Sequence, residues 1–241
     1  MQTGLYVALS SQIALERRMN TIADNVANAN TVGFRGTEIK FDEVLGNTQP
    51  AKVSFVDQGK DYLKTSSGAL TLTGGQLDVA IKGNAWFSID TQAGPALTRD
   101  GRFTITEAGE LVTVNGHPVL DAGGAPIQLN AGGGEIVIGA DGAISQGGNP
   151  VAALGLFEGN FENGFTRYGN SAVMPMTPPE AVIDRFDVGV MQGYVEEANV
   201  DPIQSMTQLI AVSRAFDHVS ALMRQGEGTL DEAIKTLGGS R

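Results

Sequence analysis

The sequence predicts an α+β fold in which one helix at each end of the chain flanks a central antiparallel β-domain. Near both termini, apolar residues recur every three or four positions, which is the period of an amphipathic helix. Between the ends the period falls to two and is interrupted by glycine-rich turns, and glycine makes up 32 of the 241 residues. Because isolated helices are marginal in water, we expect the terminal helices to pack as a coiled-coil-like pair.

The first segment carries one apolar stripe at alternating steps of three and four positions. Its members are Leu5, Ala8, Leu15, Met19, Ile22, Val26 and Ala29, with Gln12 as the polar exception. The predicted helix ends in the stretch NVANANTVGFRG, residues 25–36, where Asn and Gly suit a left-handed helix end. Phe34 stands between Gly33 and Gly36, and we expect it to be presented on this loop as a subunit contact.

The middle of the chain alternates apolar and polar residues over short runs. Examples are Leu70–Thr73, Phe103–Thr106 and Leu111–Val114, with turn dipeptides such as Asn115-Gly116. This pattern is typical of antiparallel strands joined by tight turns. The polar stretches 36–67 and 165–190 contain Pro or Gly and are expected to be irregular connectors.

The last segment begins a second helix at Asp201-Pro202, with Asp as N-cap and Pro at the first helical position. Its stripe contains Met206, Leu209, Phe216 and Met223. The run Gln225–Gly228 has two glycines and is expected to break or kink the helix.

These elements predict four segments along the chain. They are 1–35, the N-terminal helix and asparagine-rich turn; 36–67, an irregular connector; 68–190, the β-domain; and 191–241, the C-terminal helical segment. We expect the two helical stripes to contact neighbouring copies of the chain, through Leu5, Leu15, Met19, Ile22, Val26, Met206, Leu209, Phe216 and Met223. An ordinary helix pair inside a monomer stays open as an alternative, because burying these side chains is equally favourable in both cases.

Composition and motifs argue against several other classes of protein. The net charge of −11 disfavours nucleic acid as a partner, and no run of about 20 apolar residues predicts membrane insertion. The N-terminus lacks the basic and apolar regions of a cleaved signal peptide. The chain has no cysteine and two separated histidines, His117 and His218. We therefore predict no catalytic, cofactor-binding or metal-binding residue, and no enzyme.

Trp86, in the run GNAWFSI, has two interpretations. It is either part of the core, as large rings in strands usually are, or a platform for a sugar. The second interpretation would make the chain a carbohydrate-binding β-domain protein.

Three stretches resemble signatures of the bacterial flagellar rod and hook family of axial proteins. They are Asn25–Arg35 near the N-terminus, Leu97–Phe103 followed by Gly109–Val112 in the middle, and Gln192–Asp201 leading to Arg214-Ala215-Phe216. The stretch Leu15–Asn20 and the chain length most resemble the proximal rod type of this family. The distal rod and hook types are alternatives.

The resemblance implies a structural subunit that is exported through the flagellar type III apparatus without signal cleavage. It implies that the subunit polymerises in the periplasm with copies of itself and other rod proteins and transmits motor torque to the hook. The terminal helices would form the inner layer. The signature residues then join the expected subunit contacts: Asn28, Thr31, Gly33, Phe34, Arg35, Asn199 and Arg214.

Overall fold

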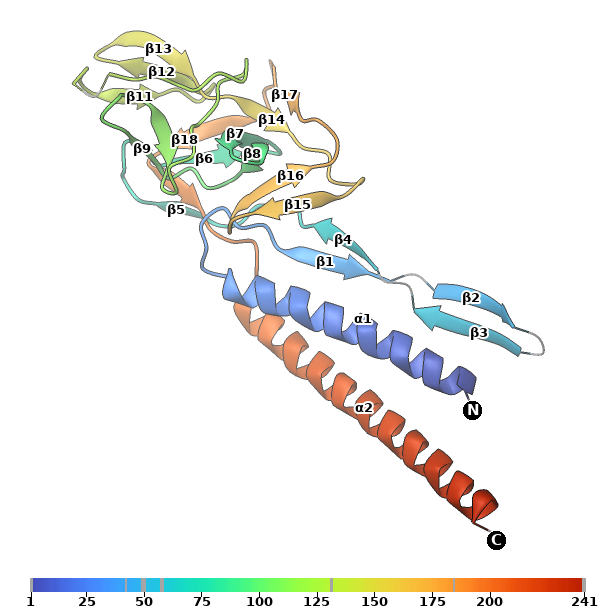
Figure 1. The fold of residues 1–241 in the computed structure, drawn as a ribbon. Helices are drawn as coiled ribbons and strands as arrows, with labels where there is room; N and C mark the ends of the chain where they lie inside the picture. The colour runs from blue at the N-terminus through green and yellow to red at the C-terminus, as the bar shows by residue number, and fades with distance from the viewer. Residues whose placement is uncertain are drawn as a thin grey trace. The chain divides into compact units, whose positions relative to one another are not determined.

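The computed structural model describes residues 2–41, 43–48, 51–56, 59–130, 132–183 and 185–239. A helix near each terminus and a central region of antiparallel strands confirm the predicted α+β fold (Figure 1). The chain forms two compact units. Unit 1 comprises Met1–Ala27, Thr37–Tyr62 and Asp201–Arg241, and unit 2 comprises Asn28–Gly36 and Leu63–Val200.

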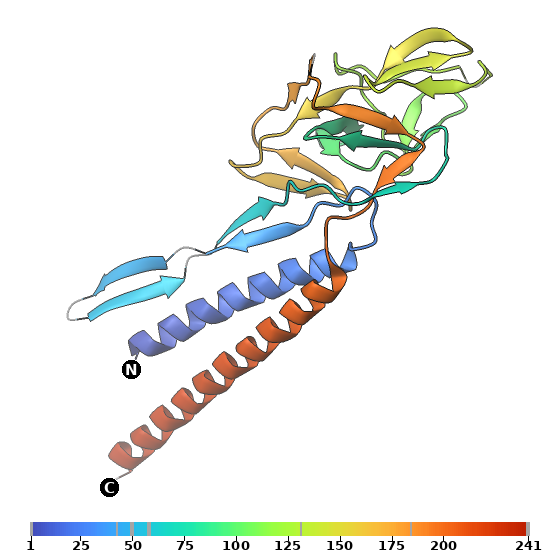
Figure 2. The same ribbon diagram turned by 180° about the vertical axis from the view of Figure 1, so that it is seen from behind.

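Unit 1 contains the two long helices, α1 (Gln2–Ala27) and α2 (Pro202–Gly238). They lie side by side and run in opposite directions in both views (Figures 1 and 2). Gln12 Nε2 donates a hydrogen bond to Ser220 Oγ at 3.3 Å, which sets the register of the pair. Ala14 and Ile22 of α1 and Val212 of α2 are buried.

The start of α2 follows the prediction, but its interior does not. Asp201 caps the helix by accepting hydrogen bonds from the backbone N–H groups of Ile203 and Gln204. The expected break at Gln225–Gly228 is wrong, since α2 continues to Gly238. Glycine in a helix costs only about 1 kcal/mol relative to alanine, so it weakens a long helix without ending it.

The expectation of an irregular stretch at 36–67 is also wrong. The stretch forms β1 (Thr37–Lys40), β2 (Glu43–Thr48), β3 (Ala51–Val56) and β4 (Lys60–Leu63). β1 pairs with β4, and β2 pairs with β3 as an antiparallel hairpin. Arg17 of α1 binds this region through Asp61 Oδ2 at 3.0 Å and Gly59 O at 3.1 Å. Glu43–Thr48 and Lys60–Leu63 do not alternate apolar and polar residues, so the period of two does not mark these strands in the sequence.

Unit 2 holds the remaining strands, and its main sheet has six of them in the order β15-β16-β8-β7-β14-β17. A three-stranded sheet, β11-β12-β13, and the pairs β9-β10, β6-β18 and β5-β19 complete the described β-structure. The strand bounds are β5 Leu70–Leu72, β6 Val79–Lys82, β7 Trp86–Thr91, β8 Gly94–Thr98, β9 Phe103–Ile105, β10 Leu111–Thr113, β11 Ile136–Ile138, β12 Ala143–Gln146, β13 Asn149–Ala153, β14 Leu156–Glu158, β15 Phe165–Tyr168, β16 Ala172–Pro175, β17 Glu180–Ala181, β18 Gly189–Gln192 and β19 Tyr194–Glu196.

The stretch 165–190 was expected to be irregular and instead contains β15 to β17 and the start of β18. After it, the chain returns to the beginning of unit 2. β18 pairs antiparallel with β6, and β19 pairs antiparallel with β5. This return brings the C-terminal signature beside residues that precede it by more than 100 positions, with Val195 opposite Thr71.

Candidate functional site

Three charged residues from the three signature stretches meet inside unit 2. Arg35 ends the asparagine-rich turn, Arg99 follows β8, and Glu196 is the last residue of β19. Arg35 Nη2 lies 2.7 Å from Glu196 Oε1, and Arg99 Nη1 lies 3.1 Å from Glu196 Oε2. All three side chains are 1% exposed. We call Arg35, Arg99 and Glu196 the arginine–glutamate cluster.

Backbone groups hold each member of the cluster in place. Gly68 N donates to Glu196 Oε1 at 2.8 Å. Arg99 donates to Ile81 O at 3.1 Å and to Gly83 O at 2.6 Å, at the end of β6 and just beyond it. Arg35 donates to Ser66 O. The cluster therefore joins the N-terminal turn, the β-domain and the returning C-terminal segment.

Trp86 of β7 packs against both arginines. Its ring centroid lies 5.7 Å from the guanidinium carbon of Arg35 and 5.6 Å from that of Arg99, within cation–π range. The ring also meets Phe161 edge to face at 5.2 Å and is fully buried. The sugar-platform interpretation of Trp86 is therefore wrong, because no face of the ring is open to a ligand.

The cluster contains two cations and one anion. The pKa of Arg99 is lowered to about 10, because the lowering by burial, the largest cause, and by Arg35 outweighs the raising effect of Glu196. Burial also lowers the pKa of Arg35 despite the opposing effect of Glu196. Both guanidinium groups still carry a proton at neutral pH. The carbonyl oxygens and the indole face stabilise the excess positive charge, so losing any one partner leaves a buried charge uncompensated.

The asparagine-rich turn docks on the segment that follows Glu196. Gly33 N donates to Glu196 O at 2.7 Å, and Asn199 N donates to Phe34 O at 3.2 Å. The Asn199 side chain accepts from Gly36 N at 2.7 Å and donates to Ser66 O at 2.8 Å. The N-terminal and C-terminal signatures are thus bound to each other within one chain.

Phe34 is buried rather than presented on the loop. Its side chain is 1% exposed, and the guanidinium carbon of Arg167 lies 4.5 Å from its ring centroid. The prediction that the loop presents this aromatic ring is therefore wrong. The ring is buried because the turn docks on the C-terminal segment. A subunit contact through Phe34 or Arg35 stays a prediction that the single chain does not test.

Gly33 is required by geometry in this turn. Its φ is +69°, in the left-handed region that side chains disfavour. A Cβ at this position would lie 2.2 Å from the backbone nitrogen of Asp100. The turn can approach the stretch after β8 only because Gly33 has no side chain.

The other predicted contact residues fall into three groups. Asn28 and Thr31 are half-buried and build the turn, where Thr31 N donates to Asn28 O at 3.0 Å. The stripe residues on the two helices are buried or half-buried in the single chain: Leu15, Met19, Ile22, Val26, Leu209, Phe216 and Met223. Met206 and Arg214 are exposed, and the side chain of Leu5 lies outside the described residues.

A second apolar stripe on each helix was missed from sequence. The α1 stripe is Tyr6, Leu9 and Ile13, and the α2 stripe is Ile203, Met206 and Ile210, of which only Met206 was predicted. These side chains are 43–79% exposed. Their steps of three and four residues were visible in the sequence, but a helix with two stripes does not show which one its partner covers.

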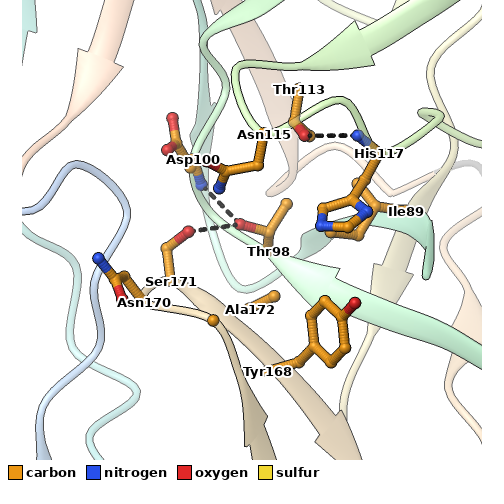
Figure 3. Close-up of a pocket in the computed structure, with 11 residues that line it drawn as sticks. Ile89, Thr98, Asp100, Thr113, Asn115, His117, Tyr168, Asn170, Ser171 and Ala172 are labelled. Carbon is orange, nitrogen blue, oxygen red and sulfur yellow. Dashed lines mark hydrogen bonds between the residues drawn. The ribbon is translucent and has the colours of Figure 1, made fainter. Parts of the chain in front are cut away.

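One pocket of unit 2 is small and lies beside the ends of β8 and β16 (Figure 3). Thr98, Asp100, His117 and Ser171 line it, and the His117 ring lies edge to face with Tyr168. Its volume is about 20 Å³, enough for roughly one water molecule and too small for a sugar ring.

Two further features concern metal ligands and the length and hydropathy of the helices. In the part of the chain that the structure describes, no three His, Asp or Glu side chains are grouped to hold a metal ion. None of the helices among the described residues is long and apolar enough to span a membrane.

Three family descriptions match this chain in order. "Flagella basal body rod protein" matches residues 5–35, "Flagellar hook protein FlgE/F/G D1 domain" matches 80–146, and "Flagellar basal body rod FlgEFG protein C-terminal" matches 191–236. Each matched range contributes one member of the arginine–glutamate cluster: Arg35, Arg99 and Glu196.

Curated relatives are similar over the whole chain. The flagellar basal-body rod protein FlgF of Rhizobium meliloti is 69% identical, covering 100% of both chains. FlgF of Mesorhizobium japonicum is 57% identical, covering 99% of both chains. The flagellar basal-body rod protein FlgG of Agrobacterium fabrum is 31% identical, covering 97% of this chain and 99% of its own.

Proposed function

The chain belongs to the flagellar basal-body rod protein family, and on that premise we propose that it is a FlgF-type structural subunit that polymerises helically in the periplasm and transmits motor torque to the hook. The observation that carries this proposal is the match to FlgF proteins over the full length of the chain. The lower identity to the FlgG protein favours the proximal over the distal rod type.

The helices supply the surface for polymerisation. The six residues of the two exposed stripes, Tyr6, Leu9, Ile13, Ile203, Met206 and Ile210, stay in water when the chain is alone. Burying such a side chain contributes about 1.5–3 kcal/mol, so a polymer that covers these faces is favoured over free chains. The originally predicted stripe residues would then support the interface from behind, by packing the two helices together.

The arginine–glutamate cluster has a mechanical part in this proposal. The segment after α1 and the segment before α2 are joined to each other and to the β-domain by this cluster. Part of the torque that enters through the helices passes through these two segments. A buried polar network specifies one arrangement of its members, so the cluster fixes how the two segments dock on the β-domain.

The family also supports the partners and the route to the periplasm. We include in the proposal that other rod proteins and the flagellar type III export apparatus are partners, and that no signal peptide is cleaved. The subunit acts through packing contacts rather than through catalysis.

Complementation tests the proposal. A Rhizobium meliloti strain that lacks its own FlgF, given this chain, should swim, and electron microscopy of its basal bodies should show the chain in the rod wall. Density only in a surrounding ring, or none, would reject a rod subunit.

A pair of variants links motility to the exposed helical face. Leu9→Asp with Ile13→Asp places charge on the exposed α1 stripe and should abolish swimming while the isolated chain stays folded. Glu16→Gln is the matched control, because position 16 lies on the same face two turns after Leu9 and is already polar. Normal swimming of the double aspartate variant would contradict assembly through this face.

A further inference from the structure

The N-terminal segment of each long helix contains no charged residue, and in the antiparallel pair these two segments lie at opposite ends. Residues 2–15 of α1 and residues 202–213 of α2 contain no charged side chain, in a chain with 43 charged residues from 16 basic and 27 acidic ones. Charge begins at Glu16 on α1 and at Arg214 on α2. Each helix therefore starts with an uncharged segment, which covers about half of α1 and a third of α2.

Within a single chain these two uncharged segments do not face each other. The helices are antiparallel, and the contact of Gln12 with Ser220 sets their register. Residues 2–15 then lie level with 217–230, which include Asp217 and Arg224. Residues 202–213 lie level with the end of α1, which includes Asp24.

The two exposed apolar stripes lie on these uncharged segments. Tyr6, Leu9 and Ile13 are exposed on α1, and Ile203, Met206 and Ile210 are exposed on α2. In an antiparallel arrangement the two stripes match, with Ile13 beside Ile203, Leu9 beside Met206, and Tyr6 beside Ile210. No single chain can make this match, because Leu9 is level with position 223 of its own α2.

We infer that the uncharged half of α1 in one copy packs against the uncharged start of α2 in the next copy, which is displaced along the helix axis. The displacement is the distance from position 223 to Met206, which is seventeen residues of helix or about 25 Å. The inference rests on the proposed rod assembly and names the pair of surfaces that carries it.

The occupant of each stripe is a second copy, because the chain itself carries the complementary stripe. Copies related by helical symmetry share one orientation, so a neighbour's α1 runs antiparallel to α2 as it does within one chain. The two surfaces differ, so the contact is heterologous and propagates into an open helix rather than closing as a dimer.

Energetics explain why this contact belongs to a polymer. Six partly exposed apolar side chains, at about 1.5–3 kcal/mol for each complete burial, offer several kcal/mol. Association alone costs an estimated 4–15 kcal/mol. Two isolated copies therefore pair weakly, and the contact becomes stable where each subunit makes it on both sides.

Engineered cysteines test the pairing in assembled basal bodies, since the chain has no native cysteine. Leu9→Cys with Met206→Cys in one chain should give disulfide-linked multimers after mild oxidation. An intramolecular bond is excluded, because about 25 Å of helix separates the levels of these positions and a disulfide needs Cα atoms within roughly 7 Å. Ile13→Cys with Ile203→Cys is a second, independent pair that should give the same result.

The matched control is Leu9→Cys with Leu237→Cys. Leu237 is exposed and apolar like the stripe residues, but it lies outside the uncharged segment of α2 and fourteen residues beyond position 223, which is level with Leu9. This control and each single-cysteine variant should stay at the mass of one chain.

The outcomes separate this inference from the proposed function. Absence of the unmodified chain from basal bodies would reject the proposed function. Presence of the chain in basal bodies with no multimers from either cysteine pair would overturn the inference alone. Disulfide-linked dimers from a single-cysteine variant would show symmetric pairing and would overturn it as well.

Discussion

Glu196 links the N-terminal turn and the C-terminal segment of unit 2 to its β-domain. Its carboxylate meets one arginine from the N-terminal turn and one from the β-domain, and its backbone oxygen accepts from Gly33 N. A buried ion pair adds little net stability over an apolar core of the same shape, but losing one partner is costly. The cluster therefore acts mainly to specify which three segments meet.

Glu196→Gln should lower the free energy of unfolding of unit 2 by about 3–5 kcal/mol, because two buried guanidinium groups lose the carboxylate that they share. Trp86 is the single tryptophan of the chain and touches both arginines, so its fluorescence during urea unfolding reports on this site.

Glu158→Gln is the control for this substitution. Glu158 pairs with Arg185 at 2.7 Å on the surface, where water screens the pair, so the urea midpoint should hardly move. Equal midpoints for the Glu196 and Glu158 variants would show that the buried cluster does not hold the unit together.

Gly33→Ala should destabilise unit 2 more than a substitution at an ordinary left-handed glycine. The control is Gly116→Ala, which has a φ of +80° and no atom near the added Cβ. That control should cost only the left-handed strain of about 1–2 kcal/mol. The Gly33 variant adds a clash with the Asp100 backbone, so thermal unfolding should occur at a lower temperature, and equal melting temperatures would contradict the close approach.

At the scale of elements, α2 continues through Gly226 and Gly228, where the sequence predicts a break or kink. Open space surrounds both Gly226 and Gly228. Gly226→Ala with Gly228→Ala should therefore stabilise the helix by about 1 kcal/mol per site and raise the helical signal in circular dichroism. Ala221→Gly in the same helix is the reverse control and should lower that signal. Unchanged helicity in both variants would show that helix propensity does not limit this end of α2.

Strand β11 pairs with β12 along one edge, and a glutamine side chain binds its other edge. Gln192 Oε1 accepts from Ile138 N at 3.1 Å, and its Nε2 donates to Ile136 O at 2.9 Å and to Gln76 O at 2.8 Å. One glutamine of the C-terminal signature thus ties β11 to the start of unit 2.

Gln192→Ala should cost about 1–3 kcal/mol, since it leaves partly buried backbone groups without partners. Gln76→Ala is the control, because only the backbone oxygen of Gln76 takes part and its side chain is exposed. Urea unfolding followed by Trp86 fluorescence compares the two, and a smaller loss for Gln192→Ala than for the control would contradict its bridging role.

At the scale of the whole molecule, the two units differ in how much each buries. Unit 2 contains both buried hydrophobic clusters, one around Val79, Phe87 and Leu111 and one around Trp86 and Phe161. Along α2, most described side chains are exposed. Local opening is easiest where few apolar contacts must be broken.

Hydrogen exchange of the isolated full-length chain should therefore be faster for the amides of α1 and α2 than for those of β7 and β8. Incorporation into the rod should slow exchange in the helices, because their exposed faces become covered. The Glu196→Gln variant supplies the contrast, since it should speed exchange in unit 2 while leaving the helices unchanged. Full helical protection in the dilute free chain would contradict a helix pair that depends on neighbours.

The sequence by itself determined the α+β class, the start of α2 at Asp201, and the family, because periodicity, capping and signature residues are local patterns. Only the tertiary structure decided that Arg35, Arg99 and Glu196 form one centre, since pairing across more than 60 positions leaves no periodic trace. The tertiary structure also decided which helical stripe stays exposed. Where a helix carries two apolar stripes, its register against the partner helix decides which stripe is buried. Contacts such as the hydrogen bond from Gln12 to Ser220 set that register.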